Sequence, residues 1–201
     1  MHDLVFVSGW AGSVSLFPRL AATSRFLVPF LHHDEAEIAR TLQQGGTTLA
    51  GWSTGSHIIC KHLPEVLHRF DRIVLVAPFL AFPRYMPRSR VDAMITAMGR
   101  DPDRTVESFL KRCGHGGPVS SASADAPSLV KGLRFLLQST AELPQGLSCG
   151  NLTLVHGERD RIVPVQASLD IMSALPGARL VRVMSGHLVD ETILLHYLHE
   201  A

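Results

Sequence analysis

The sequence has 201 residues and a formal net charge of +1, and 46% of its residues are hydrophobic. This length and composition fit one folded domain with a sizeable core, and the near-neutral charge gives no electrostatic support for a nucleic-acid partner. The three cysteines have neither paired spacing nor a metal-ligand pattern, so we expect reduced thiols in a cytoplasmic protein. Because no secretion signal and no bilayer-length apolar run is recognisable, no membrane association is expected.

Six short apolar runs predict the strands of a parallel sheet. Their Val, Leu, Ile and Phe residues show little polar alternation, which is typical of strands buried on both faces. Stretches long enough for a helix separate most of the runs, so the pattern predicts an α/β fold with right-handed crossovers. The expected strands are Asp3–Ser8, Ser24–Pro29, Thr47–Trp52, Arg72–Pro78, Leu152–His156 and Ala178–Met184, and the expected helices between them include Val14–Ala22, Glu35–Gln43, Ser56–Arg69 and Pro164–Leu175.

More than seventy residues separate the fourth run from the fifth. Helices are expected within this gap at Val91–Met98, Pro102–Cys113 and Leu129–Leu137, with a loop at Gly114–Pro127. The gap follows the carboxyl end of a strand, which is the edge where ligands bind in open α/β sheets. We therefore predict a helical lid at residues 81–150, inserted into a core of residues 1–80 and 151–201.

The expected lid is basic. Residues 81–135 contain nine Lys or Arg and five Asp or Glu, a net charge of +4, whereas the rest of the chain carries −3. Solvated helices often carry charge without a function. The functional alternative is a docking face for an acidic partner.

The segment Gly51-Trp52-Ser53-Thr54-Gly55 fits the G-x-S-x-G pattern, in which a serine lies at a sharp strand-to-helix turn. An expected strand precedes the segment and an expected helix follows it, as the pattern requires. A side chain in place of either glycine would crowd the helix against the strand. The segment therefore predicts Ser53 as a nucleophile held near the N-terminal amides of a helix.

A serine hydroxyl needs an adjacent base to become nucleophilic, and the base needs an orienting acid. With this serine turn, the three residues occur in the order serine, acid, histidine. Asp160 follows the fifth expected strand and His187 follows the sixth, at the same sheet edge as Ser53. We therefore predict Asp160 as the acid and His187 as the base. Glu158 is a second candidate for the acid, and Asp190 is a weaker third.

The oxyanion hole of such a site requires two backbone N–H donors. We expect them from Thr54, directly after the serine, and from Trp10, in the glycine-containing loop after the first strand. This chemistry needs no organic cofactor, and the scattered histidines show no metal-ligand spacing, so neither a cofactor nor a metal is expected. The residues expected to line the acyl site are Trp10, Phe79, Phe82, Met86, Phe109 and Leu188.

Four segments together resemble the α/β-hydrolase superfamily: Gly9-Trp10, the serine turn, Gly157–Pro164 and Gly186-His187. Trp10, Trp52 and residues 103–110 look more specifically like the pimeloyl-acyl-carrier-protein methyl ester esterases of biotin synthesis. The resemblance implies a compact α/β-hydrolase fold of about six mainly parallel strands with flanking helices and a helical lid. It also implies a serine carboxylesterase, with a small-molecule or carrier-bound acyl ester as substrate.

In that family, lid arginines contact the acidic acyl carrier protein, which makes Arg84, Arg88 and Arg90 candidates for carrier docking. The sequence departs from the family pattern in having Ser8-Gly9 where relatives often have His-Gly, and in lacking the usual N-terminal antiparallel strands. These departures leave other substrates open, namely a small ester, a thioester or a lipid-type acyl group. A non-catalytic, ligand-binding relative is a further alternative, which the intact serine, acid and histidine disfavour.

Overall fold

A computed structural model describes residues 4–144 and 146–199. Its centre is one six-stranded sheet in the order β2-β1-β3-β4-β5-β6, and every pairing between these strands is parallel. The predicted parallel α/β architecture is thus confirmed, although Asp3 of the first expected strand lies outside the described residues. The strands are β1 (Leu4–Val7), β2 (Arg25–Leu27), β3 (Gly46–Trp52), β4 (Phe70–Val76), β5 (Leu152–Gly157) and β6 (Arg179–Val183).

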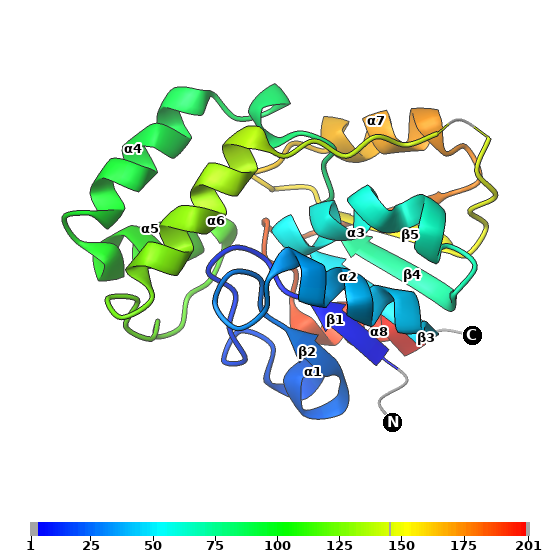
Figure 1. The fold of residues 1–201 in the computed structure, drawn as a ribbon, viewed down its shortest axis with the longest axis horizontal. Coiled ribbons are helices and arrows are strands. Elements are labelled where there is room, and N and C mark those ends of the chain that lie inside the picture. The colour runs from blue at the N-terminus through cyan, green and yellow to red at the C-terminus, as the bar shows by residue number, and fades with distance from the viewer. Residues whose placement is uncertain (1–3, 145, 200–201) are drawn as a thin grey trace.

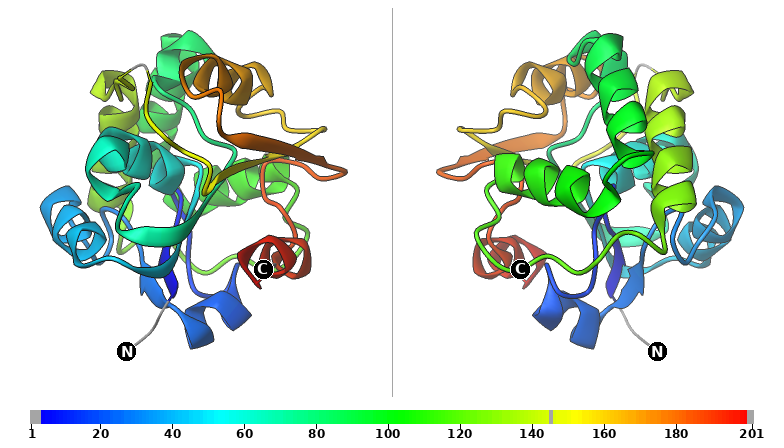
Figure 2. Two further views of the ribbon diagram at one scale, coloured as in Figure 1. Left: turned by 90° about the vertical axis from the view of Figure 1, so that its right-hand side faces the viewer. Right: turned by 90° about the vertical axis from the view of Figure 1, so that its left-hand side faces the viewer.

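Helices cover both faces of the sheet (Figure 2). Side chains alternate along β1, so that Leu4 and Phe6 belong to one hydrophobic cluster and Val5 and Val7 to the other. The first cluster includes residues of α1 (Pro18–Thr23) and α8 (Glu191–His199), and the second includes residues of α2 (Glu35–Gln44), α3 (Thr54–Val66) and α7 (Gln166–Ala174).

Two helices begin later than the sequence predicts, and a proline lies at or just before the start of each. The helix expected from Val14 starts at Pro18, whose fixed φ suits a first helical position and whose missing N–H costs nothing there. The helix expected from Pro164 starts at Gln166, after tight turns in which Ala167 and Ser168 donate to the carbonyls of Pro164 and Val165.

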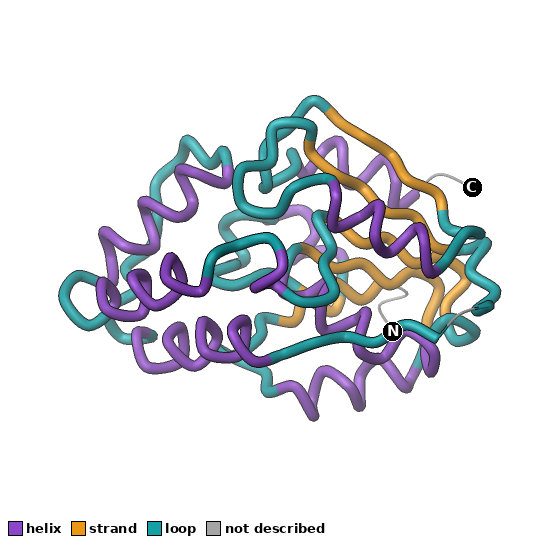
Figure 3. Tube along the Cα trace, turned by 90° about the horizontal axis from the view of Figure 1, so that it is seen from above, coloured by secondary structure: helices purple, strands orange, loops and turns teal. Residues whose placement is uncertain are grey.

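The segment between β4 and β5 contains η1 (Phe82–Arg84), α4 (Arg88–Met98), α5 (Pro102–Cys113) and α6 (Ala126–Gln138). The three longer helices gather at one end of the strands (Figures 1 and 3). As expected from the sequence, α5 begins at a capping aspartate, since the Asp101 carboxylate accepts from the N–H of Arg104. The helix ends at Gly114, whose φ of 103° favours glycine.

No helix within residues 4–144 and 146–199 is both long enough and apolar enough to cross a membrane.

Candidate active site

Ser53 lies at the junction of β3 and α3 in a backbone conformation that most residues avoid, with a φ of 54°. The two glycines of the turn allow this geometry. A Cβ at Gly55 would lie 2.0 Å from the carbonyl oxygen of Val7, and a Cβ at Gly51 would lie 2.8 Å from the amide nitrogen of Ser56. The turn therefore has room for glycine alone at both positions, and it holds the Ser53 hydroxyl at the carboxyl end of the sheet.

The structure brings Ser53, His187 and Asp160 into one hydrogen-bonded chain. The Nδ1 of His187 is 2.7 Å from Oδ2 of Asp160, and the Nε2 of His187 is 2.8 Å from the hydroxyl of Ser53. A carboxylate only accepts hydrogen bonds, so Nδ1 carries the proton and Nε2 accepts from the serine. This tautomer places the basic nitrogen of the imidazole against the hydroxyl that it would deprotonate.

The Asp160 carboxylate is held on both oxygens. While Oδ2 accepts from His187, Oδ1 accepts from the backbone N–H groups of Ile162 and Val163 at 2.8 and 2.9 Å. Neither alternative acid reaches the imidazole in this way. Glu158 is exposed and lies 3.6 Å from Arg182, and Asp190 accepts from the N–H of Thr192 at the start of α8.

Solved structures of several hydrolases share this architecture. An esterase from Exiguobacterium antarcticum is 18% identical, with a TM-score of 0.72 over 98% of this chain and 91% of that chain. The α/β hydrolase enzyme MGS-M2 from a Medee basin deep-sea metagenome library is 13% identical, with a TM-score of 0.70 over 100% and 90% of the two chains. The chain has the α/β-hydrolase fold.

A third solved structure with this fold is the type II thioesterase BorB from the borrelidin biosynthetic cluster. It is 15% identical, with a TM-score of 0.61 over 98% of this chain and 92% of that chain. No protein-family model and no curated protein matches the sequence. The likeness therefore extends to the fold, whereas the chemistry depends on the residues of the site.

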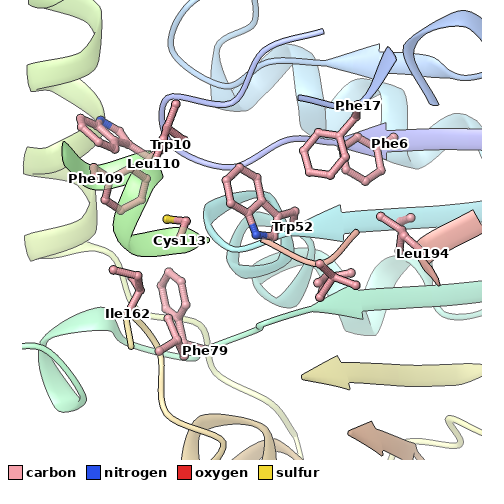
Figure 4. Close-up of a cluster of buried hydrophobic side chains, with 14 of the residues drawn as sticks. Phe6, Trp10, Phe17, Trp52, Phe79, Phe109, Leu110, Cys113, Ile162 and Leu194 are labelled. Atoms are coloured by element: carbon pink, nitrogen blue, oxygen red, sulfur yellow. The ribbon is translucent and has the colours of Figure 1, made fainter. Parts of the chain in front are cut away.

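One positioning contact of the site could not be predicted from the sequence. The indole Nε1 of Trp52 donates to the backbone carbonyl of His187 at 2.8 Å, so the residue before Ser53 holds the loop that carries His187. Trp52 is almost fully buried and packs against Phe17 (Figure 4). The tryptophan inside the serine turn was the only sequence signal for this contact, and it does not specify a partner 135 residues away.

His156, near the end of β5, supports the loop that carries Asp160. Its Nε2–H donates to the carbonyl of Val163 at 2.9 Å, and its Nδ1 accepts from the hydroxyl of Ser168 at 2.8 Å. Burial lowers the pKa of His156, so the ring is neutral beside Asp160, whose Oδ2 is 3.6 Å from its Nε2. The imidazole of His156 thus connects the end of β5 with Val163, beyond Asp160, and with Ser168 at the start of α7.

The two expected oxyanion donors lie beside each other. Thr54 is the first residue of α3, so its N–H has no acceptor within the helix. The N–H of Trp10 donates to the hydroxyl of Thr54 across a long distance of 3.3 Å. An oxyanion is a stronger acceptor than a hydroxyl, so a reacting carbonyl would replace Thr54 as the partner of Trp10.

The indole of Trp10 faces α5 and α6. Its Nε1 donates to the carbonyl of Leu129 in α6 at 2.8 Å, and its ring packs edge-on against Phe109 with centroids 4.8 Å apart (Figure 4). The end of α5 also covers His187, since the N–H of Leu188 donates to the carbonyl of Cys113 at 2.9 Å. His187 is consequently fully buried.

A groove of about 900 Å³ lies between α4 and α5 and reaches Ile162 behind the acid. Of the expected acyl-site residues, Phe82, Met86 and Phe109 line it. Phe79 does not: it is fully buried with its ring stacked on His57 at 4.9 Å. Leu188 borders a different depression beside Gly114 and Asp190.

The candidate docking arginines are all exposed but face different surroundings. Arg90 lines the groove. The guanidinium of Arg88 donates to the carbonyl of Leu137 at the end of α6. Arg84 lies in η1, one residue before Tyr85, whose hydroxyl bonds to Asp170 in α7.

Among the described residues, no group of three or more His, Cys, Asp and Glu side chains is arranged to hold a metal ion.

His57 joins α3 to the start of the segment between β4 and β5 and to the end of α6. Its Nδ1–H donates to the carbonyl of Phe79 at 3.0 Å, and its Nε2 accepts from the hydroxyl of Ser139 at 2.8 Å. Burial lowers the pKa of His57 to about 4. The folded state therefore keeps this imidazole neutral over a pH range in which the unfolded chain binds a proton.

We expect acid to destabilise the fold through His57. The unfolded pKa is about 6.5 and the folded pKa is about 4, so stability is lost as the pH falls through this interval, by about 3 kcal/mol. Urea unfolding of the wild type and of His57→Gln at pH 7 and pH 4 measures the effect, and the variant should lose less stability by about this amount. His68→Gln, at an exposed histidine, is the control. Equal losses in the wild type and His57→Gln would contradict the assignment.

Proposed function

We propose that the protein is a serine carboxylesterase, and one observation carries the proposal: the chain from Asp160 through His187 to Ser53, with distances of 2.7 and 2.8 Å. His187 takes the proton of Ser53 as the hydroxyl oxygen attacks the acyl carbonyl, while the N–H groups of Thr54 and Trp10 stabilise the oxyanion. His187 then protonates the leaving alcohol, and water cleaves the acyl-enzyme by the same steps. Asp160 fixes the tautomer and stabilises the imidazolium.

For the substrate, we propose the methyl ester of a pimeloyl-acyl carrier protein, as in biotin synthesis. Two features support this choice. The first is the likeness of Trp10, Trp52 and residues 103–110 to the esterases of that pathway. The second is the basic lid, whose exposed Arg84, Arg88 and Arg90 offer a surface for an acidic carrier.

Reversing the charge at these arginines tests the carrier. In Arg84→Glu/Arg88→Glu/Arg90→Glu, we expect kcat/KM for the carrier-linked methyl ester to fall about 100-fold, because each lost attraction becomes a repulsion. Hydrolysis of a short p-nitrophenyl ester should change by less than about threefold, since none of the three arginines contacts Ser53, His187 or Asp160. Arg19→Glu/Arg40→Glu/Arg179→Glu, at exposed arginines outside the lid, is the matched control.

Equal losses for the carrier-linked and the short ester would count against docking.

A cellular test addresses the biotin pathway. The wild type, but not Ser53→Ala, should let a biotin-requiring strain without its own esterase grow in the absence of biotin.

The substrate alternatives are a small ester, a thioester or a lipid-type acyl group. The apolar groove between α4 and α5 suits any of these, and the fold is shared with both an esterase and a thioesterase. Comparing kcat/KM for a free methyl ester, an acyl thioester and the carrier-linked ester separates them. A preference for the carrier-linked ester over free methyl pimelate would favour the biotin-pathway substrate.

A further inference from the structure

The groove between α4 and α5 combines an apolar floor with a cationic rim. Its floor includes Phe82, Val91, Met94, Phe109 and Ile162, from both helices, from η1 and from the loop after β5. Its volume of about 900 Å³ is near the upper end for sites that hold small organic molecules. The groove therefore has space and apolar surface for an aliphatic chain.

Five arginines also line this groove, and all of them are exposed: Arg90, Arg100, Arg104, Arg112 and Arg161. The lining contains one carboxylate, that of Asp101, and it accepts from the backbone N–H of Arg104. Within residues 4–144 and 146–199, no ion pair joins any of the five guanidinium groups to a carboxylate. The excess positive charge at the rim is thus available to an external anion.

We propose that this groove binds a single-chain amphiphilic anion of the fatty carboxylate type. The chain would lie on the apolar floor, and the carboxylate would pair with guanidinium groups at the rim, whose planar geometry suits two parallel hydrogen bonds. A cationic amphiphile would meet five like charges. Each buried methylene group contributes up to about a fourfold gain in affinity. A short carboxylate has few such groups and would therefore bind weakly.

Binding of an anion in this groove does not require the proposed chemistry. The groove lining includes none of Ser53, His187 and Asp160, although Arg161 and Ile162 directly follow the acid in the chain. Binding should therefore survive the loss of the nucleophile. A failure of the esterase proposal would leave this inference standing, and the reverse also holds.

Calorimetric titration with dodecanoate, kept below its micelle concentration, tests the inference. We expect one saturable site on the wild type and on Ser53→Ala, and weaker binding of octanoate and at high salt. Arg100→Gln/Arg104→Gln should weaken binding about tenfold, equivalent to about 1.4 kcal/mol. Arg112→Gln/Arg161→Gln should weaken it similarly. Arg40→Gln/Arg179→Gln, at exposed arginines outside the groove, should leave it within about twofold of the wild type.

Three results would overturn the proposal. One is the absence of dodecanoate binding to the folded wild type. Another is equal binding of dodecyltrimethylammonium, which would show that the guanidinium groups do not select charge. The third is equal weakening in the groove variants and the control variant. Binding only to micelles or to anionic vesicles would likewise contradict a site for a single chain. Circular dichroism spectra establish that each variant is folded.

Discussion

Ser53→Ala is expected to remove ester hydrolysis almost completely, with kcat falling on the order of a million-fold. The substitution deletes the attacking oxygen and leaves His187 without a proton to accept. The side chain of Ser53 forms one hydrogen bond, to His187, so its loss should not unfold the protein. Hydrolysis of a p-nitrophenyl ester gives the rate, and a fluorophosphonate probe should label the wild type but not the variant.

The matched control is Ser56→Ala. Ser56 is also buried in α3, but its hydroxyl donates to the carbonyl of Val76 and has no contact with His187. This variant should lose about 1 kcal/mol of stability and keep its activity. If Ser53→Ala stayed active, or if only Ser56→Ala lost activity, the serine mechanism would be wrong. A folded wild type that does not react with the probe would favour a non-catalytic binding protein.

The second large effect is expected for Asp160→Asn, with kcat lower by about 10⁴-fold. The carbamoyl oxygen can still accept from Ile162 and Val163 at Oδ1, so the loop keeps its shape. Its NH₂ group then faces His187 and donates to Nδ1, which moves the imidazole proton to Nε2. In that tautomer, His187 cannot accept the proton of Ser53.

Glu158→Gln is the control, because Glu158 lies on the same loop but points to Arg182. Its activity should stay within about twofold of the wild type, since no contact of the triad is lost. Steady-state rates for both variants decide the identity of the acid. A larger loss in Glu158→Gln than in Asp160→Asn would transfer that role to Glu158.

The local sequence predicted much of the fold. The apolar runs predicted all six strands to within a few residues, because strands buried on both faces need continuous Val, Leu, Ile and Phe. The helix starts were predicted less closely, since turns precede Pro18 and follow Pro164. A proline marks the region in which a helix starts but not the first residue with helical hydrogen bonds. The chain order also sufficed to bring Ser53, Asp160 and His187 to one sheet edge, because parallel strands end on the same side.

The role of each aromatic side chain could not be predicted in this way. Phe79 was expected to line the acyl site but lies under His57, and Trp10 turns its indole toward Leu129 of α6. The groove between α4 and α5 was not predicted either. All of these depend on how α4, α5 and α6 pack against loops of the core. A sequence pattern does not predict that packing, because it does not distinguish between apolar residues of similar size.

The sequence by itself determined the strands, the serine turn and the order of the three reactive residues, because each depends on neighbouring residues or on the direction of parallel strands. Tertiary structure alone decided that Trp52 holds His187, that the end of α5 covers His187, and that five arginines line one groove. These contacts join segments separated by up to 135 residues. Their partners are selected by shape and hydrogen-bond geometry once the chain has folded, and no local pattern encodes that selection.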